Sequence, residues 1–229
     1  MSPAGILSPM GIAQTIIVHP EWVAAQDPAR WLTGSELAVY NAWPSETRRA
    51  EWLAGRLAAK RLVGETFGLP PLDFAIGRQG SAPCILSAEV PPVTLSLSHS
   101  HGLGAATVSD SQREGSVGVD VQRIRPVHRG LCARIFTPDE REEIADHFGS
   151  EDHTAGMLLF WALKEAAIKA RRVAWGRPLR EIEARLTGEG NAAVLMTGEA
   201  SMTAAYERVD GWWLARVVRP LTSGGSSGK

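Results

Sequence analysis

Two carboxylates and two lysines stand out because their spacing places them on two regular elements about forty residues apart. Asp120 lies in the apolar run GVDV, which predicts a short strand, and Glu165 lies between Lys164 and Lys169 in FWALKEAAIKA, which predicts a helix. Oxygen ligands on two rigid elements suit a divalent metal, and neighbouring lysines suit the phosphates of a substrate. The pattern therefore indicates metal-dependent chemistry on a phosphorylated compound.

Each of these groups also has a simpler interpretation. Glu165 and Lys169 are four residues apart, so they would form a solvated ion pair on an exposed helix. Asp120 would cap a turn at the end of its strand. The surroundings favour the site, because a charge among valines or on a largely apolar helix needs a partner or a metal.

A serine–histidine pair and a basic helix add candidates for anion binding. Ser98 and His99 lie in LSLSHSH, and a hydroxyl beside an imidazole suits a phosphate. A serine hydrolase is only weakly indicated, because no G-x-S-x-G motif surrounds the serine. Arg56 and Lys60 belong to one basic stripe of a predicted helix, and Arg78 joins them from the next turn. A solvated basic face is the alternative for this stripe.

The elements that must position these residues fall into two groups. Strands are predicted at 15–18, 72–76, 84–86, 93–97, 104–108, 116–121, 182–186, 192–196 and 201–218, the last broken by a turn at 210–211. Helices are predicted over 34–67 with a break at Pro44, near 128–136, and over 138–148 and 152–173. The polar stretch 109–116 separates the groups. We therefore expect an α+β fold of two similar halves, 1–112 and 113–221, and a disordered tail over 222–229.

Charge and composition exclude several classes of protein. The 229 residues carry a net charge of −1, so a general nucleic-acid-binding surface is not expected. No apolar run reaches the ~20 residues of a membrane span, and the first residues lack the basic stretch of a signal peptide. Two cysteines are too few for a disulfide framework. The chain is expected to be cytoplasmic, with neither nucleic acid nor membrane as a partner.

Five segments in order resemble the 4′-phosphopantetheinyl transferases, in particular the larger Sfp-type enzymes. They are GRLAAKRLV, GRQGSAPCIL, LSLSHSHGLGAA, GVDVQRIRP, and FTPDEREEI followed by FWALKEAAIKA, within residues 48–220. The W-x-x-K-E-A-x-x-K and G-V-D-V patterns are the most specific parts.

The resemblance implies an α+β pseudodimer that works as a monomer, with coenzyme A in the cleft between its halves. The implied activity is of the holo-[acyl-carrier-protein] synthase type. The enzyme would use Mg²⁺ to transfer the phosphopantetheine arm of coenzyme A to a serine of an apo acyl or peptidyl carrier protein. Adenosine 3′,5′-bisphosphate would be released.

The resemblance also implies roles for particular residues. Those implied to hold the metal are Asp120, Gln122 and Glu165. Those implied to contact coenzyme A are Arg56, Lys60, Arg78, Ser98, His99, Lys164 and Lys169. Catalytic roles fall to Glu165, Lys169 and Glu140, and the general base is left open between Glu140, Glu165 and a bound water.

Two positions depart from the family pattern. Gln122 stands where many Sfp-type enzymes have an acidic residue, so we expect a weaker or differently hydrated metal. Ala82 stands where a lysine usually precedes the proline, and Arg78 is predicted to supply that charge. Two alternatives therefore stay open. One is a non-catalytic module that binds coenzyme A or a carrier protein, and the other is a metal-dependent phosphohydrolase on a different fold.

Overall fold

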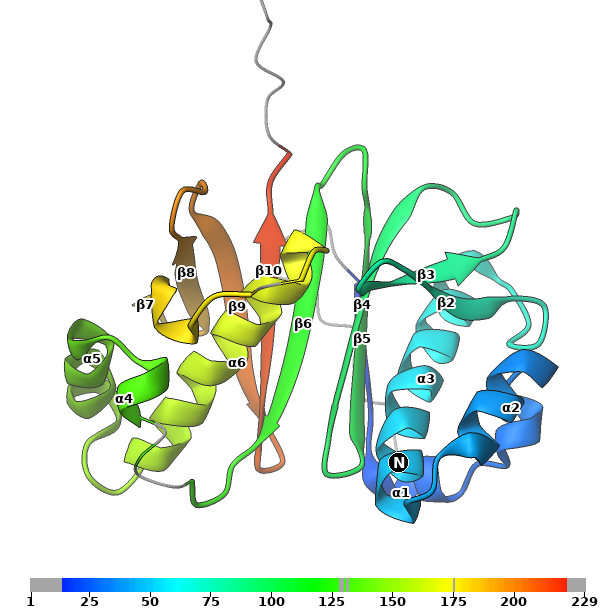
Figure 1. The fold of residues 1–229 in the computed structure, drawn as a ribbon, viewed down its shortest axis with the longest axis horizontal. Helices are drawn as coiled ribbons and strands as arrows, with labels where there is room; N and C mark the ends of the chain where they lie inside the picture. Colours follow the sequence, from blue (N-terminus) through cyan, green and yellow to red (C-terminus); the bar gives the residue numbers. More distant parts are fainter. Residues whose placement is uncertain (1–13, 128–129, 131, 175, 222–229) are drawn as a thin grey trace, which may run out of the picture.

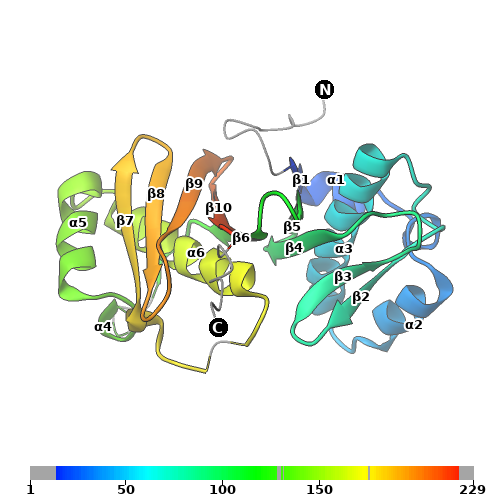
Figure 2. The same cartoon turned by 90° about the horizontal axis from the view of Figure 1, so that it is seen from above.

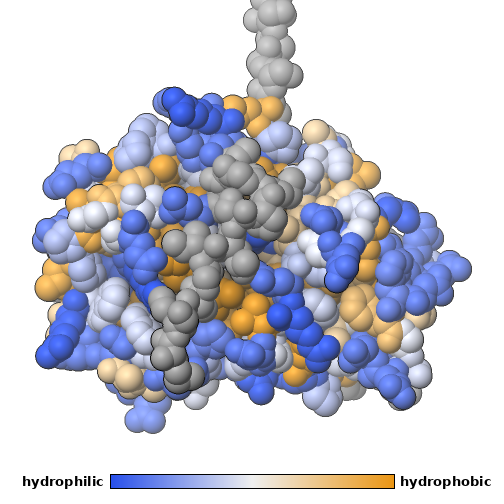
Figure 3. All heavy atoms as spheres, turned by 180° about the vertical axis from the view of Figure 1, so that it is seen from behind, coloured by the Kyte–Doolittle hydropathy of each residue, from blue (hydrophilic) through white to orange (hydrophobic). Residues whose placement is uncertain are grey.

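The computed structural model describes residues 14–127, 130, 132–174 and 176–221, and it shows two α+β halves side by side (Figure 1). The predicted tail and part of the predicted helix near 128–136 lie outside the described residues. Viewed from above, the sheets of the two halves meet in the middle of the molecule (Figure 2). The back face has hydrophilic flanks, and hydrophobic side chains lie toward its centre (Figure 3).

The N-terminal half is a three-stranded antiparallel sheet with a long helix against it. Its strands are β1 (Gln14–Val18), β4 (Val93–Ser100) and β5 (Leu103–Asp110), in the order β1-β5-β4. Its helices are α1 (Pro20–Ala24), the short η1 (Pro28–Arg30), α2 (Gly34–Ala42) and α3 (Glu46–Phe67). A separate hairpin is formed by β2 (Ala75–Gln79) and β3 (Ala82–Leu86). As predicted, the helical stretch breaks at Pro44, and the Ser45 side chain caps α3.

The C-terminal half has the same plan with a larger sheet. Its strands are β6 (Ser116–Arg123), β7 (Ile182–Gly188), β8 (Asn191–Met196), β9 (Met202–Val209) and β10 (Trp212–Arg219), in the order β6-β10-β9-β8-β7. Its helices are α4 (Cys132–Ile135), α5 (Pro138–Phe148), α6 (His153–Arg171) and the short η3 (Leu179–Glu181). The pairings β1–β5–β4 and β2–β3 correspond to β6–β10–β9 and β7–β8. Each helix in the described ranges is too short or too polar to cross a bilayer.

A buried glutamate–lysine pair fastens the long helix of the N-terminal half. Glu36 forms a capping box with Thr33 at the start of α2, and it accepts the backbone N–H of Ile76 on β2 at 3.0 Å. Lys60 on α3 pairs with Glu36 at 2.7 Å and donates to two carbonyls of the loop before β2. The Lys60 side chain is completely buried, so its charge is compensated inside the protein.

The C-terminal half contains the same arrangement. Glu140 forms a capping box with Thr137 at the start of α5 and accepts the N–H of Ala184 on β7 at 2.8 Å. Lys164 on α6 pairs with Glu140 at 2.6 Å and also donates to backbone carbonyls at the end of α4 and in η3. Glu140 and Lys164 therefore hold α5, α6 and β7 together, as Glu36 and Lys60 hold α2, α3 and β2.

The two halves meet along β4 and β6, which are edge strands of their sheets. Hydroxyl groups on every second residue of β4 accept backbone N–H groups of β6, at four positions in all. The pairs are Thr94 with Val117, Ser96 with Val119, Ser98 with Val121, and Ser100 with Arg123, at 3.0–3.3 Å. We call this row the hydroxyl seam. It satisfies donors of β6 that would otherwise form an exposed sheet edge.

An apolar cluster also joins the halves. It combines residues of β1 and β5 with residues of β6 and β10, namely Ile17, Leu103, Ala105, Val119, Val121, Trp212 and Leu214. The indole N–H of Trp212 donates to the carbonyl of Ser100 at 2.9 Å, which adds a directional contact to this packing.

Most predicted elements are confirmed, and two loops are shorter than the sequence suggested. Strand β4 continues to Ser100, because its backbone stays paired with β5 as far as Ser100 and Leu103. The link to β5 is only His101-Gly102, and both residues have positive φ, as a tight hairpin requires. The β2–β3 hairpin likewise turns within two residues, at Gly80-Ser81.

Candidate functional site

Asp120 lies at the seam and is held by side chains from both halves. Its side chain is buried, and its Oδ1 accepts the hydroxyl of Ser98 at 2.7 Å and Nζ of Lys169 at 2.6 Å. Its Oδ2 accepts Nε2 of Gln122 at 2.8 Å. The carboxylate therefore has its desolvation compensated by donors on both oxygens.

Glu165 is brought toward Asp120 because α6 packs very closely on β6. A Cβ at Gly118 would lie 1.9 Å from the carbonyl oxygen of Ala166, so only glycine permits this approach. Burial raises the pKa of Glu165, and the negative charge of Asp120 raises it further, while Lys169 acts in the opposite direction. The two carboxylates therefore repel each other, and a cation between them would relieve that repulsion.

The donor set at this point fits Mg²⁺. Asp120 and Glu165 supply carboxylate oxygens, and Gln122 adds an amide oxygen. Mg²⁺ in proteins is commonly held by one or two carboxylates, substrate phosphates and water. In the ranges that the structure describes, there is no group of three or more His, Cys, Asp or Glu side chains arranged for a metal. The remaining ligands would have to come from substrate and solvent.

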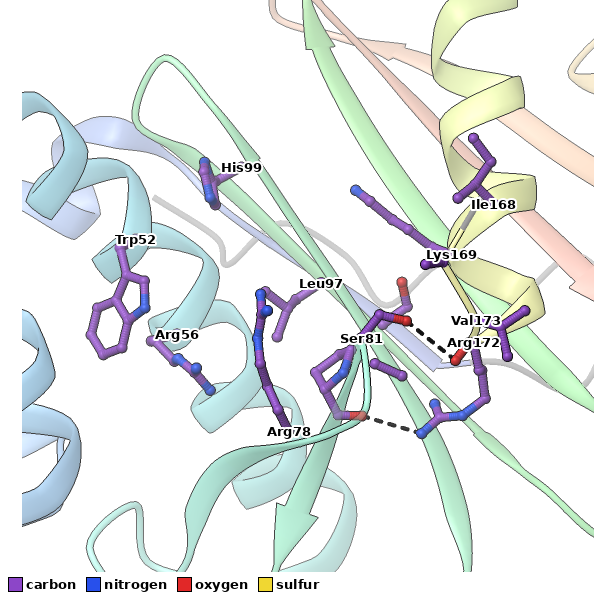
Figure 4. A pocket seen from close by; sticks show the side chains of 14 residues that line it. Trp52, Arg56, Arg78, Ser81, Leu97, His99, Ile168, Lys169, Arg172 and Val173 are labelled. Carbon is purple, nitrogen blue, oxygen red and sulfur yellow. Dashed lines mark hydrogen bonds between the residues drawn. The ribbon is translucent and has the colours of Figure 1, made fainter. Parts of the chain in front are cut away.

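A cationic pocket of about 270 Å³ lies between the halves, next to these residues (Figure 4). Arg56 comes from α3, Arg78 from β2, and Lys169 and Arg172 from the end of α6. The described residues that line it include no carboxylate. Its remaining wall is largely apolar, with Trp52, Leu97, Ile168 and Val173. Such a pocket suits a ligand that has both anionic groups and a flat or apolar part.

Arg172 connects the two sides of this pocket. It ends α6 with a positive φ of 61° and sends its guanidinium across the cleft to the carbonyls of Leu95 and Pro83, both at 3.3 Å. Its own carbonyl accepts the hydroxyl of Ser81 at 3.5 Å, and Figure 4 shows these contacts with the β2–β3 hairpin. Arg172 thus fastens a hairpin that has no backbone pairing with the larger sheets.

His99 faces the pocket, on the opposite side of β4 from Ser98. Its Nδ1 lies 3.2 Å from a carboxylate oxygen of Glu51 on α3. Burial lowers the pKa of His99, Glu51 opposes that shift, and Lys169 adds to it. Burial thus favours the neutral imidazole, and a bound anion would favour its protonated form.

The structure brings together seven of the predicted residues and places four others elsewhere. Those at the carboxylates or the pocket are Asp120, Gln122, Glu165, Lys169, Arg56, Arg78 and His99. Lys60 and Lys164 are wrongly predicted as ligand contacts, because both ammonium groups are fully buried in the ion pairs described above. Glu140 is buried with both oxygens bonded, so it does not reach the pocket. Ser98 points into the seam.

Sequence reasoning missed three residues of the site. Trp52 lines the pocket, and the guanidinium of Arg56 lies 4.9 Å from the centre of its ring. Glu51 holds His99, and Arg172 fastens the hairpin. The only sequence signal for Arg172 was the basic run that follows Lys169. Trp52 gave no signal of its own, because a tryptophan on a helix is usually a core residue.

Comparisons with known proteins relate this chain to one family of enzymes. Residues 116–217 match the family model described as the 4′-phosphopantetheinyl transferase superfamily. The chain is 35% identical over 130 residues to the 4′-phosphopantetheinyl transferase AcpT of Salmonella typhimurium, covering 56% of this chain and 62% of that protein. It is 25% identical over 142 residues to psf-1 of Bacillus pumilus, covering 62% and 58%. It is 29% identical over 198 residues to Svp of Streptomyces mobaraensis, covering 84% and 77%. The chain thus spans about 60% of the length of the first two relatives.

Two solved structures show a weaker likeness. The holo-[acyl-carrier-protein] synthase of Thermotoga maritima has a TM-score of 0.37 and 21% identity, covering 45% of this chain and 61% of that one. A holo-(acyl-carrier-protein) synthase of Bacillus anthracis in complex with CoA (3′,5′-ADP) has a TM-score of 0.40 and 22% identity, covering 47% and 96%. The chain is therefore similar, over residues 116–217 and over the stretches aligned with these relatives, to members of the 4′-phosphopantetheinyl transferase superfamily.

Proposed function

We propose that this protein transfers the 4′-phosphopantetheine arm of coenzyme A to a serine hydroxyl of an apo acyl or peptidyl carrier protein, with release of adenosine 3′,5′-bisphosphate. The observation that carries the proposal is the pocket between the halves, which four cationic side chains line from both sides, next to two carboxylates. Coenzyme A has phosphates for the cations and an aromatic base for the apolar wall. The curated relatives named as 4′-phosphopantetheinyl transferases support the same reaction.

The reaction requires a nucleophile, a base and charge stabilisation at the pyrophosphate. The serine oxygen forms a bond to the phosphorus that carries the pantetheine arm. The P–O bond to the second phosphate breaks, and adenosine 3′,5′-bisphosphate leaves with the electron pair. Mg²⁺, when bound by Asp120 and Glu165, would supply charge neutralisation at the pyrophosphate oxygens. Lys169 already contacts Asp120 and lines the pocket, so it is placed to meet the same phosphates.

The serine proton must go to Glu165 or to a water molecule. Glu165 lies near Asp120, where the metal and the pyrophosphate would be held, which makes it suitable as an acceptor. Glu140 is unsuitable, because its oxygens bond to Lys164 and to backbone N–H groups of α5 and β7. We therefore assign the base to Glu165 or to a water beside it.

We also propose that the two halves form a pseudodimer and that the chain acts as a monomer. The matched strand pairings and the repeated glutamate–lysine pair support a common origin of the halves. Because both halves supply pocket residues, one chain suffices to build the site.

The decisive experiment incubates the protein with coenzyme A and a panel of apo carrier proteins, with Mg²⁺ or with EDTA. We expect a carrier mass increase equal to one phosphopantetheine, with Mg²⁺ only. Arg78→Ala should raise the KM for coenzyme A, whereas Arg113→Ala, on the exposed β5–β6 turn, should not. If coenzyme A binds but no carrier is modified, the protein is a binding module, the alternative that Gln122 favours.

A further inference from the structure

Glu51 connects the long helix of the N-terminal half to the tip of the β4–β5 hairpin. Its Oε2 lies 3.2 Å from Nδ1 of His99, and its Oε1 accepts the backbone N–H of His101 at 3.1 Å. Gly55, one turn later on α3, leaves room for the ring, because a Cβ there would lie 3.3 Å from Cδ2 of His99. The imidazole is therefore seated on α3 in a defined orientation.

We propose that Glu51 is a positioning residue that keeps the hydrogen of the neutral His99 ring on Nδ1 and supplies the counter-charge when His99 takes up a second ring proton to bind a phosphate. A carboxylate can only accept hydrogen bonds, so the ring nitrogen beside it carries the hydrogen. Nε2 of the neutral ring then has a lone pair and no hydrogen. That nitrogen is the one left for a ligand in the pocket that His99 lines (Figure 4).

This arrangement couples phosphate binding to proton uptake. The oxygens of a phosphate dianion are acceptors, so they cannot bond to a ring nitrogen that also has only a lone pair. One proton from solvent therefore binds to Nε2 of His99. The imidazolium then donates from Nε2 to the phosphate and from Nδ1 to Glu51. The phosphate, the imidazolium and the carboxylate form a row of alternating charge.

Glu51 is the carboxylate available to compensate the imidazolium. The charged groups that act on His99 are Glu51 on α3, Lys169 on α6 and Asp120 on β6. Burial and Lys169 disfavour the imidazolium, whereas the two carboxylates favour it. Asp120 is already paired with Lys169 at 2.6 Å, so its charge is compensated there. The larger stabilisation of the imidazolium therefore comes from Glu51.

The inference rests on the proposed function for its ligand, and two measurements test it without relying on transfer. Heteronuclear NMR of the free wild-type protein near about pH 8 should find the hydrogen of the His99 ring on Nδ1. Calorimetry with adenosine 3′,5′-bisphosphate in EDTA, repeated in buffers of different ionisation enthalpy near about pH 7.5, counts the protons taken up on binding. The wild-type protein should take up protons and bind the nucleotide more tightly as the pH falls.

Glu51→Gln removes the charge and keeps the size of the side chain. It should abolish the proton uptake and weaken nucleotide binding about 10-fold near pH 6, with a smaller effect near pH 8. Glu46→Gln is the matched control, because it removes the same charge from the exposed first turn of α3, away from His99. It should take up protons and bind the nucleotide as the wild-type protein does.

Two results would overturn the inference. A hydrogen on Nε2 of free wild-type His99 would show that Glu51 does not select the tautomer, and this measurement needs no variant. Equal proton uptake in the wild-type protein and Glu51→Gln would show that the charge of Glu51 has no part in it. Failure of the wild-type protein to bind the nucleotide would reject both the coupling and the proposed ligand. If no carrier is modified but the uptake depends on Glu51, the transfer reaction is rejected and the role of Glu51 stands.

Discussion

Breaking the buried Glu140–Lys164 pair should lower the stability of the protein and leave the transfer rate per folded molecule unchanged. Glu140 is 2% exposed and Lys164 is fully buried, and Glu140→Gln would leave the ammonium without its counter-charge. Removing one partner of a buried ion pair typically costs about 3–5 kcal/mol. In a protein of this size, each kcal/mol lowers the melting temperature by roughly 2–4 °C, so we expect a fall of about 6–20 °C.

The assay combines urea unfolding with the transfer rate measured well below the melting temperature. The rate per folded molecule should stay near the wild-type value, because Glu140 is bonded inside the C-terminal half and does not line the pocket. Glu36→Gln is the matched control, since it breaks the equivalent pair with Lys60 and should cost a similar amount.

The double variant Glu140→Gln/Lys164→Met should regain much of the lost stability, because it removes the uncompensated charge as well. A different result would refute this reasoning. If Glu140→Gln kept the wild-type melting temperature and lost activity by about 10²–10⁴-fold, Glu140 would be the general base after all.

Three further perturbations test the geometry of the cleft. Gly118→Ala should destabilise the protein by more than the usual ~1–3 kcal/mol of overpacking, because the added Cβ meets backbone of α6; unchanged urea unfolding would contradict the close contact. Because burial holds the pKa of His99 below its usual value and a bound phosphate would raise it, binding takes up a proton. Adenosine 3′,5′-bisphosphate should therefore bind more tightly as the pH falls from about 7.5 to about 6. His99→Gln should remove that dependence in calorimetry, and an unchanged dependence would exclude His99. Arg172→Ala should increase amide exchange in the β2–β3 hairpin and weaken nucleotide binding about 10-fold; an unaltered hairpin would show that Ser81 and Arg172 do not fasten it.

The parts of the fold that depend on local sequence were predictable. Ser45 caps α3, and the apolar periodicity placed the helices and most strands within a few residues. Asp120 and Glu165 could be found because each is a charge on a mainly apolar element, and such charges need a partner.

A ligand-binding lysine and a buried one look alike in the sequence. Lys164 and Lys169 lie five residues apart on α6, and both are cations on an apolar helix. What distinguishes them is Glu140, which lies 24 residues before Lys164 and reaches it only after α5 has packed on α6. Lys60 has the same dependence on Glu36. The error therefore arose from tertiary pairing, which no local pattern encodes.

The hydroxyl seam alone does not fix how the halves are aligned. Its acceptors recur at every second residue of β4, so a shift of two residues along β6 would preserve three of its four bonds. Such a shift would move Asp120 by about 6.6 Å relative to His99 and separate the carboxylates from the pocket. The indole of Trp212 opposes it, because its bond to the Ser100 carbonyl joins one defined pair of residues across the halves. The site therefore depends on a contact that contributes no group to the pocket itself.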